Sequence, residues 1–270
     1  MGKENITIQL LYIQPVFKKI VIVNLNINDL QIKMVNKSLD NIIDPEINNR
    51  TGTYNAIIKY ITTVPLKTII EIGASSGGGT TEAVIMGVLG KNTSNIIFNT
   101  IEVSKARFNN LKERYKMFKW VIPWNVSSLN ISDFPTDDEI KTFINDRNNP
   151  YKPSSLTDVL KWKSDDIEYV KDNDIPQDGI NLIKTYMSAD HFDLAIIDGS
   201  EFLGNKEYEH LLNCDAYILD DIYTYKNHYS YHSLLNNPNY KLLYREDRRG
   251  GSALFCKNEI FYTYFSNNGN

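Results

Sequence analysis

From Lys67 onward, short runs rich in β-branched residues alternate with segments in which apolar residues recur at helical spacing. This alternation is typical of repeated strand–helix–strand units, which build a mostly parallel sheet covered by helices. Strands are expected at residues 68–72, 96–103, 120–124, 192–198, 216–219, 240–244 and 252–256. With 270 residues, the chain is long enough to bury a single large α/β core and to carry appended segments.

The stretch KTIIEIGASSGGGTTEAVI, residues 67–85, joins the first expected strand to a helix through a turn rich in glycine. Glycine is required where the backbone takes positive φ or touches a ligand, and the start of the next helix offers unpaired N–H groups. Ser75 replaces the second glycine of the dinucleotide fingerprint GxGxxG, and no Gly-Lys-Ser/Thr of a P-loop follows. Glu71, two positions before Gly73, would repel a pyrophosphate and suits a cationic ligand. The combination favours S-adenosylmethionine over a nicotinamide dinucleotide, although the turn could also be only a tight connection.

The second expected strand ends near Glu102, where doubly wound folds place the acid that binds ribose hydroxyls. Together, EIGASSGGGT and TIEVSKARF resemble motif I and the ribose-binding acid of the class I S-adenosylmethionine-dependent methyltransferases. The form EIGxxxGxxT is nearer to their small-molecule O-methyltransferase branch. Glu102 could also be only a solvated strand end.

The resemblance extends over residues 54–258 and implies a set of cofactor contacts. The backbone of the glycine turn would surround the methionine end, and Glu102 would bind the ribose. Ser127 stands where the family contacts the adenine, often with an Asp. The implied cofactor-binding residues are Glu71, Gly73, Ala74, Ser75, Gly77, Gly79, Thr80, Glu102, Ser127 and Asp198.

Acidic residues end two further strands. FDLAIIDGSEF ends its strand in Asp198, and AYILDDIYTYKN ends the next in Asp220 and Asp221. Adjacent parallel strands would bring the three carboxylates to the edge that carries the glycine turn. Such carboxylates repel one another unless a cation joins them, and their oxygens suit Mg²⁺ or a similar divalent ion. Alternatively, Asp198 only closes a turn with Gly199, and the other two acids are polar strand ends.

The acidic pattern resembles the metal-dependent O-methyltransferases that modify sugars on macrolide antibiotics. This resemblance implies a metal ion held by Asp198, Asp220 and Asp221 against the acceptor hydroxyls, with Asp198 as the catalytic base. The histidine that usually follows IDG in those enzymes is replaced by Ser200, which leaves the acceptor open. Lys226 and the following Asn belong to a stretch similar to DDxxxxKN of some methyltransferases.

The resemblance implies a Rossmann-like, doubly wound sheet of seven mostly parallel strands whose last strand is antiparallel. We expect residues 1–52 to form an N-terminal extension with a strand or helix within 6–27. Residues 53–258 would form the methyltransferase domain, with a lid-like insertion at 146–190, and residues 259–270 a C-terminal tail.

The expected reaction is metal-assisted methyl transfer from S-adenosylmethionine to a hydroxyl of a small polar acceptor, such as a sugar or glycan. Three alternatives stay open. They are another S-adenosylmethionine-using transferase of the N-methyl or aminopropyl type, a non-catalytic S-adenosylmethionine or nucleotide binder, and a nicotinamide dehydrogenase, which Glu71 disfavours.

Charge and hydropathy argue against other classes of partner. A net charge of −4 and a pI near 5.6 provide no basic footprint for nucleic acid. The apolar stretches are interrupted well before the roughly 20 residues that a membrane span needs, and no cleavable leader pattern is found, so we expect a cytoplasmic protein. Cys214 and Cys256 are expected to be buried free thiols. The sequence leaves the oligomeric state open, a homo-oligomer included.

Local signals predict individual helices. Ser104 is expected to cap a helix that packs on the sheet, and Thr136 with Glu139 spells a capping box. His228 and His232, four positions apart, would share a helix face, either as metal ligands or as inert side chains.

Overall fold

The computed structural model of the chain describes residues 38–41, 45, 47–91, 95–146 and 155–266. The strand or helix expected within residues 6–27 lies outside the described residues, as do residues 267–270 of the tail.

In this part of the chain, seven strands form one sheet in the order β3-β2-β1-β4-β5-β7-β6. The strands are β1 (Thr68–Ile72), β2 (Ile97–Ile101), β3 (Val121–Trp124), β4 (Leu194–Ile197), β5 (Ala216–Asp220), β6 (Tyr240–Glu246) and β7 (Ser252–Lys257). The first five strands are parallel, and β7 lies antiparallel between β5 and β6. The expected fold class is confirmed.

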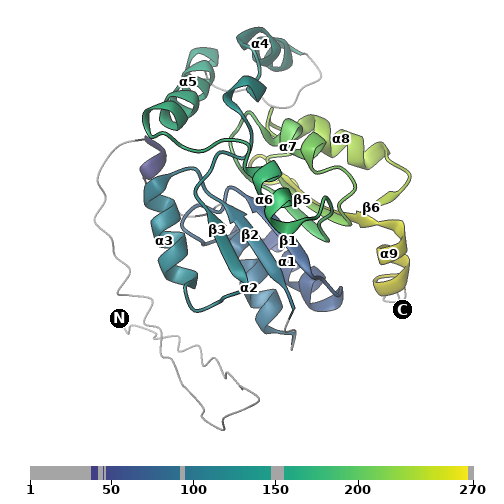
Figure 1. Ribbon diagram of the computed structural model, residues 1–270. Helices are drawn as coiled ribbons and strands as arrows, with labels where there is room; N and C mark the ends of the chain where they lie inside the picture. The colour runs from purple at the N-terminus through teal and green to yellow at the C-terminus, as the bar shows by residue number, and fades with distance from the viewer. Residues whose placement is uncertain (1–37, 42–44, 46, 92–94, 147–154, 267–270) are drawn as a thin grey trace, which may run out of the picture. The chain divides into compact units, whose positions relative to one another are not determined.

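Helices cover both faces of the sheet (Figure 1). On one face, α1 (Gly52–Thr63), α2 (Thr80–Leu89) and α3 (Lys105–Tyr115) share a buried apolar cluster with the strands. On the other face, α6 (Gly179–Met187), α7 (Gly204–His210) and α8 (His228–Asn236) form a second cluster. The remaining helical elements are η2 (Ser38–Asp40), η3 (Ile131–Asp133), α4 (Asp137–Asn145), α5 (Leu156–Asp172) and α9 (Asn258–Tyr264).

The expected helix starts are confirmed at two positions. The Ser104 hydroxyl accepts a hydrogen bond from the backbone N–H of Arg107 at 3.1 Å, which begins α3. At the start of α4, Thr136 and Glu139 accept hydrogen bonds from each other's backbone N–H groups, the two bonds of a capping box. Each cap contributes about 1 kcal/mol, because it satisfies N–H groups that the helix itself leaves unpaired.

The insertion expected at residues 146–190 contains two helices with different positions. In α6, Ile180 and Ile183 are fully buried in the cluster on the second face, so this helix belongs to the cover of the sheet. By contrast, α5 reaches the segment that follows β4, where the Ser200 hydroxyl donates to Asp166 at 2.7 Å. Of the two helices, α5 therefore contacts the loop beyond the end of β4, and its role as a lid stays a prediction.

The two cysteines are placed as the sequence predicts. Cys214 and Cys256 are free and buried, and burial raises the pKa of each thiol to about 12, so neither forms a thiolate readily at neutral pH.

His228 and His232 share a face of α8, with ring centroids 4.5 Å apart. Among the described residues, no helix combines the length and the apolar character that crossing a membrane demands.

Gly73 provides a test of the contact between the ends of β1 and β4. Its φ is +88°, and a Cβ there would lie 1.9 Å from the backbone oxygen of Asp198. Gly73→Ala should therefore lower the free energy of unfolding by about 2–4 kcal/mol, measured by urea denaturation. Gly90→Ala is the matched control, because φ is −68° there and the nearest atom would be 3.3 Å away. Equal stabilities of the two variants would contradict the close contact between Gly73 and the backbone of Asp198.

Candidate functional site

The glycine turn after β1 is a compact loop tied to the neighbouring strand. The N–H groups of Gly73 and Ala74 both donate to the backbone oxygen of Ile101 at 3.0 Å, and the Gly77 N–H donates to the Ala74 oxygen at 2.9 Å. The backbone takes positive φ at Gly73, Ser75, Gly77 and Gly79. Three of these four positions are glycine, the residue that adopts such angles without steric cost.

The glycines of the turn also face the rest of the chain. A Cβ at Gly77 would lie 2.6 Å from the ring of Tyr115, and a Cβ at Gly79 would lie 2.6 Å from the Ile47 oxygen and 2.8 Å from Pro45. Contacts within the protein therefore already explain why glycine is required at these two positions. A contact between the turn and a ligand stays a prediction.

Glu71 is fully buried and acts on the turn itself. Its two carboxyl oxygens accept hydrogen bonds from the hydroxyls of Thr80 and Thr81, at 2.6 and 2.8 Å. Burial raises the pKa of Glu71 to about 8, even though the two hydroxyls act to lower it. The carboxyl is therefore mostly protonated at pH 7, and the two hydrogen bonds hold the start of α2 against β1. Direct contact of Glu71 or Thr80 with a ligand stays a prediction.

Glu102 follows β2 and faces the glycine turn. One carboxyl oxygen accepts a hydrogen bond from the Ser75 N–H at 2.7 Å, and the other accepts from the Ser104 N–H at 2.8 Å. Burial raises the pKa of Glu102, partly offset by these N–H groups and by Arg107. A carboxylate offers about four acceptor positions, so each oxygen keeps one for another donor. The two N–H groups therefore orient the carboxylate, and a contact of Glu102 with ribose hydroxyls stays a prediction.

Ser127 lies in the loop after β3 and is bound through its main chain. Its N–H donates to the Pro176 oxygen at 2.8 Å, and its oxygen accepts from the Gly179 N–H at 2.9 Å. These bonds attach the loop to the start of α6. A contact of Ser127 with an adenine stays a prediction.

The structure brings Asp198, Asp220 and Asp221 together around a side chain of the protein. The Lys226 ammonium lies 2.9 Å from Asp198 Oδ1, 3.0 Å from Asp221 Oδ2 and 3.9 Å from Asp220 Oδ2. Only 3% of the Lys226 side chain is exposed. The clustered carboxylates require a cation, and the loop after β5 supplies one. A metal ion would have to bind carboxylate oxygens that face away from Lys226 or displace it, and its presence stays a prediction.

Protonation in this cluster is set by burial and by Lys226. Burial raises the pKa of Asp198, and it raises that of Asp220 further, while the charge of Lys226 opposes both shifts. Burial alone would lower the pKa of Lys226, but the carboxylates, led by Asp221 and Asp198, raise it well above its usual range. Lys226 therefore stays charged, and Asp220 is the acid that holds a proton most readily.

Three further acids lie around this edge and were not predicted as site residues. Burial raises the pKa of Glu201 and of Glu207 to about 7 and that of Asp166 to about 6. Glu207 is fully buried, and its Oε1 accepts from the Ser128 hydroxyl at 2.5 Å. Within the described part of the chain, its Oε2 has no hydrogen-bond partner.

Helical spacing could have identified one of these acids. Glu207 lies four positions from both Leu203 and Leu211, which are buried, so the pattern places it on the inner face of α7. No local signal identifies Asp166, because its position depends on how α5 docks against the loop after β4.

A hollow adjoins the acidic cluster between α4, α5 and the loops after β4 and β5. Its lining is mostly apolar, with a carboxylate and a hydroxyl at one side. The lining residues are Ile140, Ile144, Val159, Trp162, Glu201, Phe202, Thr224 and Tyr225. The insertion thus contributes a wall next to the strand ends.

No protein-family model matches the chain, and a search of curated proteins finds no match. Solved structures with a similar backbone include a methyltransferase from Geobacter sulfurreducens, with 9% identity over 80% of each chain and a TM-score of 0.46. An O-methyltransferase from Bacillus cereus in complex with SAH has 11% identity over 79% of this chain and 84% of that one, with a TM-score of 0.46. An SAH-bound methyltransferase from Podospora anserina has 14% identity over 76% and 77%, with a TM-score of 0.44. Likeness of this degree assigns neither a ligand nor an activity to the chain.

Lys226→Met tests whether the ammonium group neutralises the cluster. The substitution leaves buried carboxylates without a cation, so the free energy of unfolding at pH 7 should fall by about 3–5 kcal/mol. The folded variant would take up protons at these acids, so its stability should fall as pH rises and the loss should shrink toward pH 5. Urea denaturation at both pH values measures this. Lys206→Met removes an exposed ion pair and should cost less than about 1 kcal/mol. A Lys226 variant as stable as wild type at pH 7 would refute the role.

Glu71→Gln tests the protonated state of the buried acid. The folded-state pKa of about 8 lies above the ordinary value, so the folded chain holds a proton that the unfolded chain has released. The stability that this proton provides is full below the unfolded pKa and is lost as pH rises toward 8. Glutamine cannot titrate, so the variant should gain stability relative to wild type from pH 5 to pH 8 in unfolding measurements. Glu82→Gln, on the exposed side of α2, is the matched control for the change in charge. A parallel profile for the Glu71 variant and wild type would be inconsistent with a buried, protonated Glu71.

Proposed function

We propose that the chain is an S-adenosylmethionine-dependent methyltransferase that acts on a hydroxyl of a small polar acceptor. The observation that carries this proposal is where the strand order reverses. From β1 the chain proceeds through β2 to β3 on one side, and β4 then returns to the other side of β1. Open parallel sheets bind ligands at such a switch point, beyond the carboxyl ends of the strands.

The residues with candidate roles converge on this switch point. The glycine turn follows β1, Glu102 follows β2, and Asp198 follows β4 on the opposite side of β1. Contact between the turn and β4 is close, because a Cβ at Gly73 would meet the backbone of Asp198. A ligand bound across the turn would therefore have Glu102 on one side and Asp198 on the other.

Each side has a distinct role in the proposal. Glu102, fixed by the N–H groups of Ser75 and Ser104, accepts hydrogen bonds from the two ribose hydroxyls with its remaining acceptor positions. The cofactor, when bound, supplies a methyl group carried on a sulfonium sulfur. After transfer of the methyl group, this sulfur is a neutral thioether. The acidic surroundings favour this positive charge over a pyrophosphate.

Asp198 is the proposed base. As the acceptor oxygen forms its bond to the methyl carbon and the carbon–sulfur bond breaks, the hydroxyl proton passes to the Asp198 carboxylate. Burial raises the pKa of this carboxylate, which makes it a stronger base, and Lys226 at 2.9 Å holds it in place.

The proposal also includes a divalent ion at Asp198, Asp220 and Asp221. Such an ion would lower the pKa of the acceptor hydroxyl. The donor set is suitable in chemistry, because carboxylate oxygens bind Mg²⁺. Lys226 already lies between two of the three carboxylates, so it competes with such an ion.

Calorimetric titration with S-adenosylmethionine tests the proposal. We expect saturable binding, and Glu102→Gln should weaken it about tenfold or more, because a charged acceptor for two hydroxyls is lost. Glu113→Gln, on the exposed side of α3, should bind as wild type does. Absence of binding in wild type, or equal affinity in the Glu102 variant, would refute the site.

Repeating the titration and a methyl-transfer assay with magnesium and with a chelator tests the metal. Chelation that changes neither binding nor turnover would leave Lys226 as the cation of the cluster. Transfer to amines but not to hydroxyls would favour the N-methyl alternative. Binding without transfer to any member of a broad acceptor panel would indicate a non-catalytic binder.

A further inference from the structure

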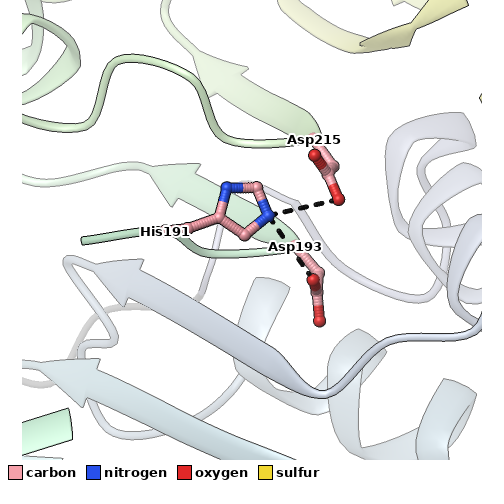
Figure 2. A group of neighbouring side chains, drawn as sticks. All are labelled: His191, Asp193 and Asp215. Carbon is pink, nitrogen blue, oxygen red and sulfur yellow. Dashed lines mark ion pairs between the residues drawn. The ribbon is translucent and has the colours of Figure 1, made fainter. Parts of the chain in front are cut away.

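A second group of potential ligands lies at the opposite edge of the sheet, away from the switch point. His191 and Asp193 precede β4, and Asp215 precedes β5. The imidazole Nε2 of His191 lies 3.3 Å from Asp215 Oδ2 and 3.7 Å from Asp193 Oδ1 (Figure 2). One potential ligand atom from each of the three residues lies within 4.8 Å of the other two. Within the described ranges, this is the group of three histidines, cysteines or acids that meets this distance.

We propose that His191, Asp193 and Asp215 form a binding site for a transition-metal dication such as Zn²⁺. Ligand atoms 2.0–2.2 Å from a tetrahedral Zn²⁺ ion lie about 3.4 Å apart. Both distances from Nε2 are close to this value, and the two carboxylate oxygens lie within 4.8 Å of each other. One nitrogen and two carboxylate oxygens suit Zn²⁺ better than Mg²⁺ or Ca²⁺, which prefer oxygen ligands alone.

Each carboxylate is oriented from its far side by groups outside the triad. Asp193 Oδ2 accepts hydrogen bonds from the backbone N–H groups of Lys67 and Thr68, at 2.5 and 2.8 Å. Asp215 Oδ1 accepts from the Lys257 ammonium at 2.8 Å. In both residues the second oxygen is left facing His191. Such outer contacts fix the orientation of ligands at metal sites.

The backbone that carries the two acids is also fixed. The Asp193 N–H donates to the Thr68 oxygen at 2.9 Å, and the Asp215 oxygen accepts from the Lys257 N–H at 2.9 Å. These bonds continue the ladders of β1, β4, β5 and β7 beyond the strand ends. The proposed ligands therefore lie on rigid elements, which favours a preformed site.

The site is separate from the proposed reaction. Asp215 and Asp220 stand at opposite ends of β5, and five residues of strand span roughly 16 Å. A bound ion would join the starts of β4 and β5 and stabilise the folded chain, without access to the acceptor. The inference does not depend on the proposed methyltransferase activity.

The inference is tested by measuring Zn²⁺ binding to the full chain after treatment with a chelator. Calorimetry measures the affinity, and metal analysis after dialysis measures the number of ions bound. Wild type should bind one Zn²⁺ ion that His191→Ala does not bind or binds at least about tenfold more weakly. Zinc in about 100-fold excess over its Kd should raise the Tm of wild type by roughly 5 °C and leave the Tm of the variant unchanged. The His191 side chain is 48% exposed, so the metal-free variant should melt as wild type does.

His210→Ala is the matched control, because it removes a histidine outside this group, and it should keep the zinc-dependent rise in Tm. Asp215→Asn should weaken binding as His191→Ala does. Equal binding by wild type and the His191 variant would place the ion elsewhere, at the His228 and His232 pair or at the carboxyl edge. That result, or no binding up to about 0.1 mM zinc, would overturn the proposal.

Discussion

The ammonium group of Lys226 makes the carboxyl edge of the sheet possible. Three aspartates at the ends of two neighbouring strands would repel one another in surroundings that exclude most water. Lys226 contacts Asp198 and Asp221 at 2.9 and 3.0 Å and is itself almost entirely buried. Because the carboxylates keep it charged and it keeps them close, neither partner is stable at this position without the other.

The strands and the starts of α3 and α4 could be predicted from the sequence because their signals are local. β-Branched runs, the cap at Ser104 and the capping box at Thr136 act over a few residues, and each element was found near its expected position. The meeting of Asp198 with the two later aspartates followed from strand adjacency. The insertion was harder to predict, because the packing of α6 on the sheet and the contact of α5 with the loop after β4 depend on distant parts of the chain.

The site was predictable in its residues but less so in their contacts. The hydrogen bonds from the Thr80 and Thr81 hydroxyls to Glu71 could not be predicted from the sequence. The sequence likewise does not show that the Lys226 ammonium lies between Asp198 and Asp221. Both outcomes depend on side-chain directions and on how loops fold back, which residue types and spacing do not specify.

Asp40 joins the start of α3 to α5, beside the carboxyl ends of the parallel strands. One of its oxygens accepts hydrogen bonds from the hydroxyls of Ser104, at the start of α3, and Tyr169, on α5, both at 2.7 Å. The Tyr169 oxygen also accepts from the Lys105 N–H at 3.0 Å. If α5 moves away, Asp40 loses the Tyr169 donor, and if η2 moves away, the Ser104 and Tyr169 hydroxyls both lose the acceptor of their protons. A single carboxylate thus links the displacement of two segments far apart in the sequence, and opening one of them weakens the hold on the other.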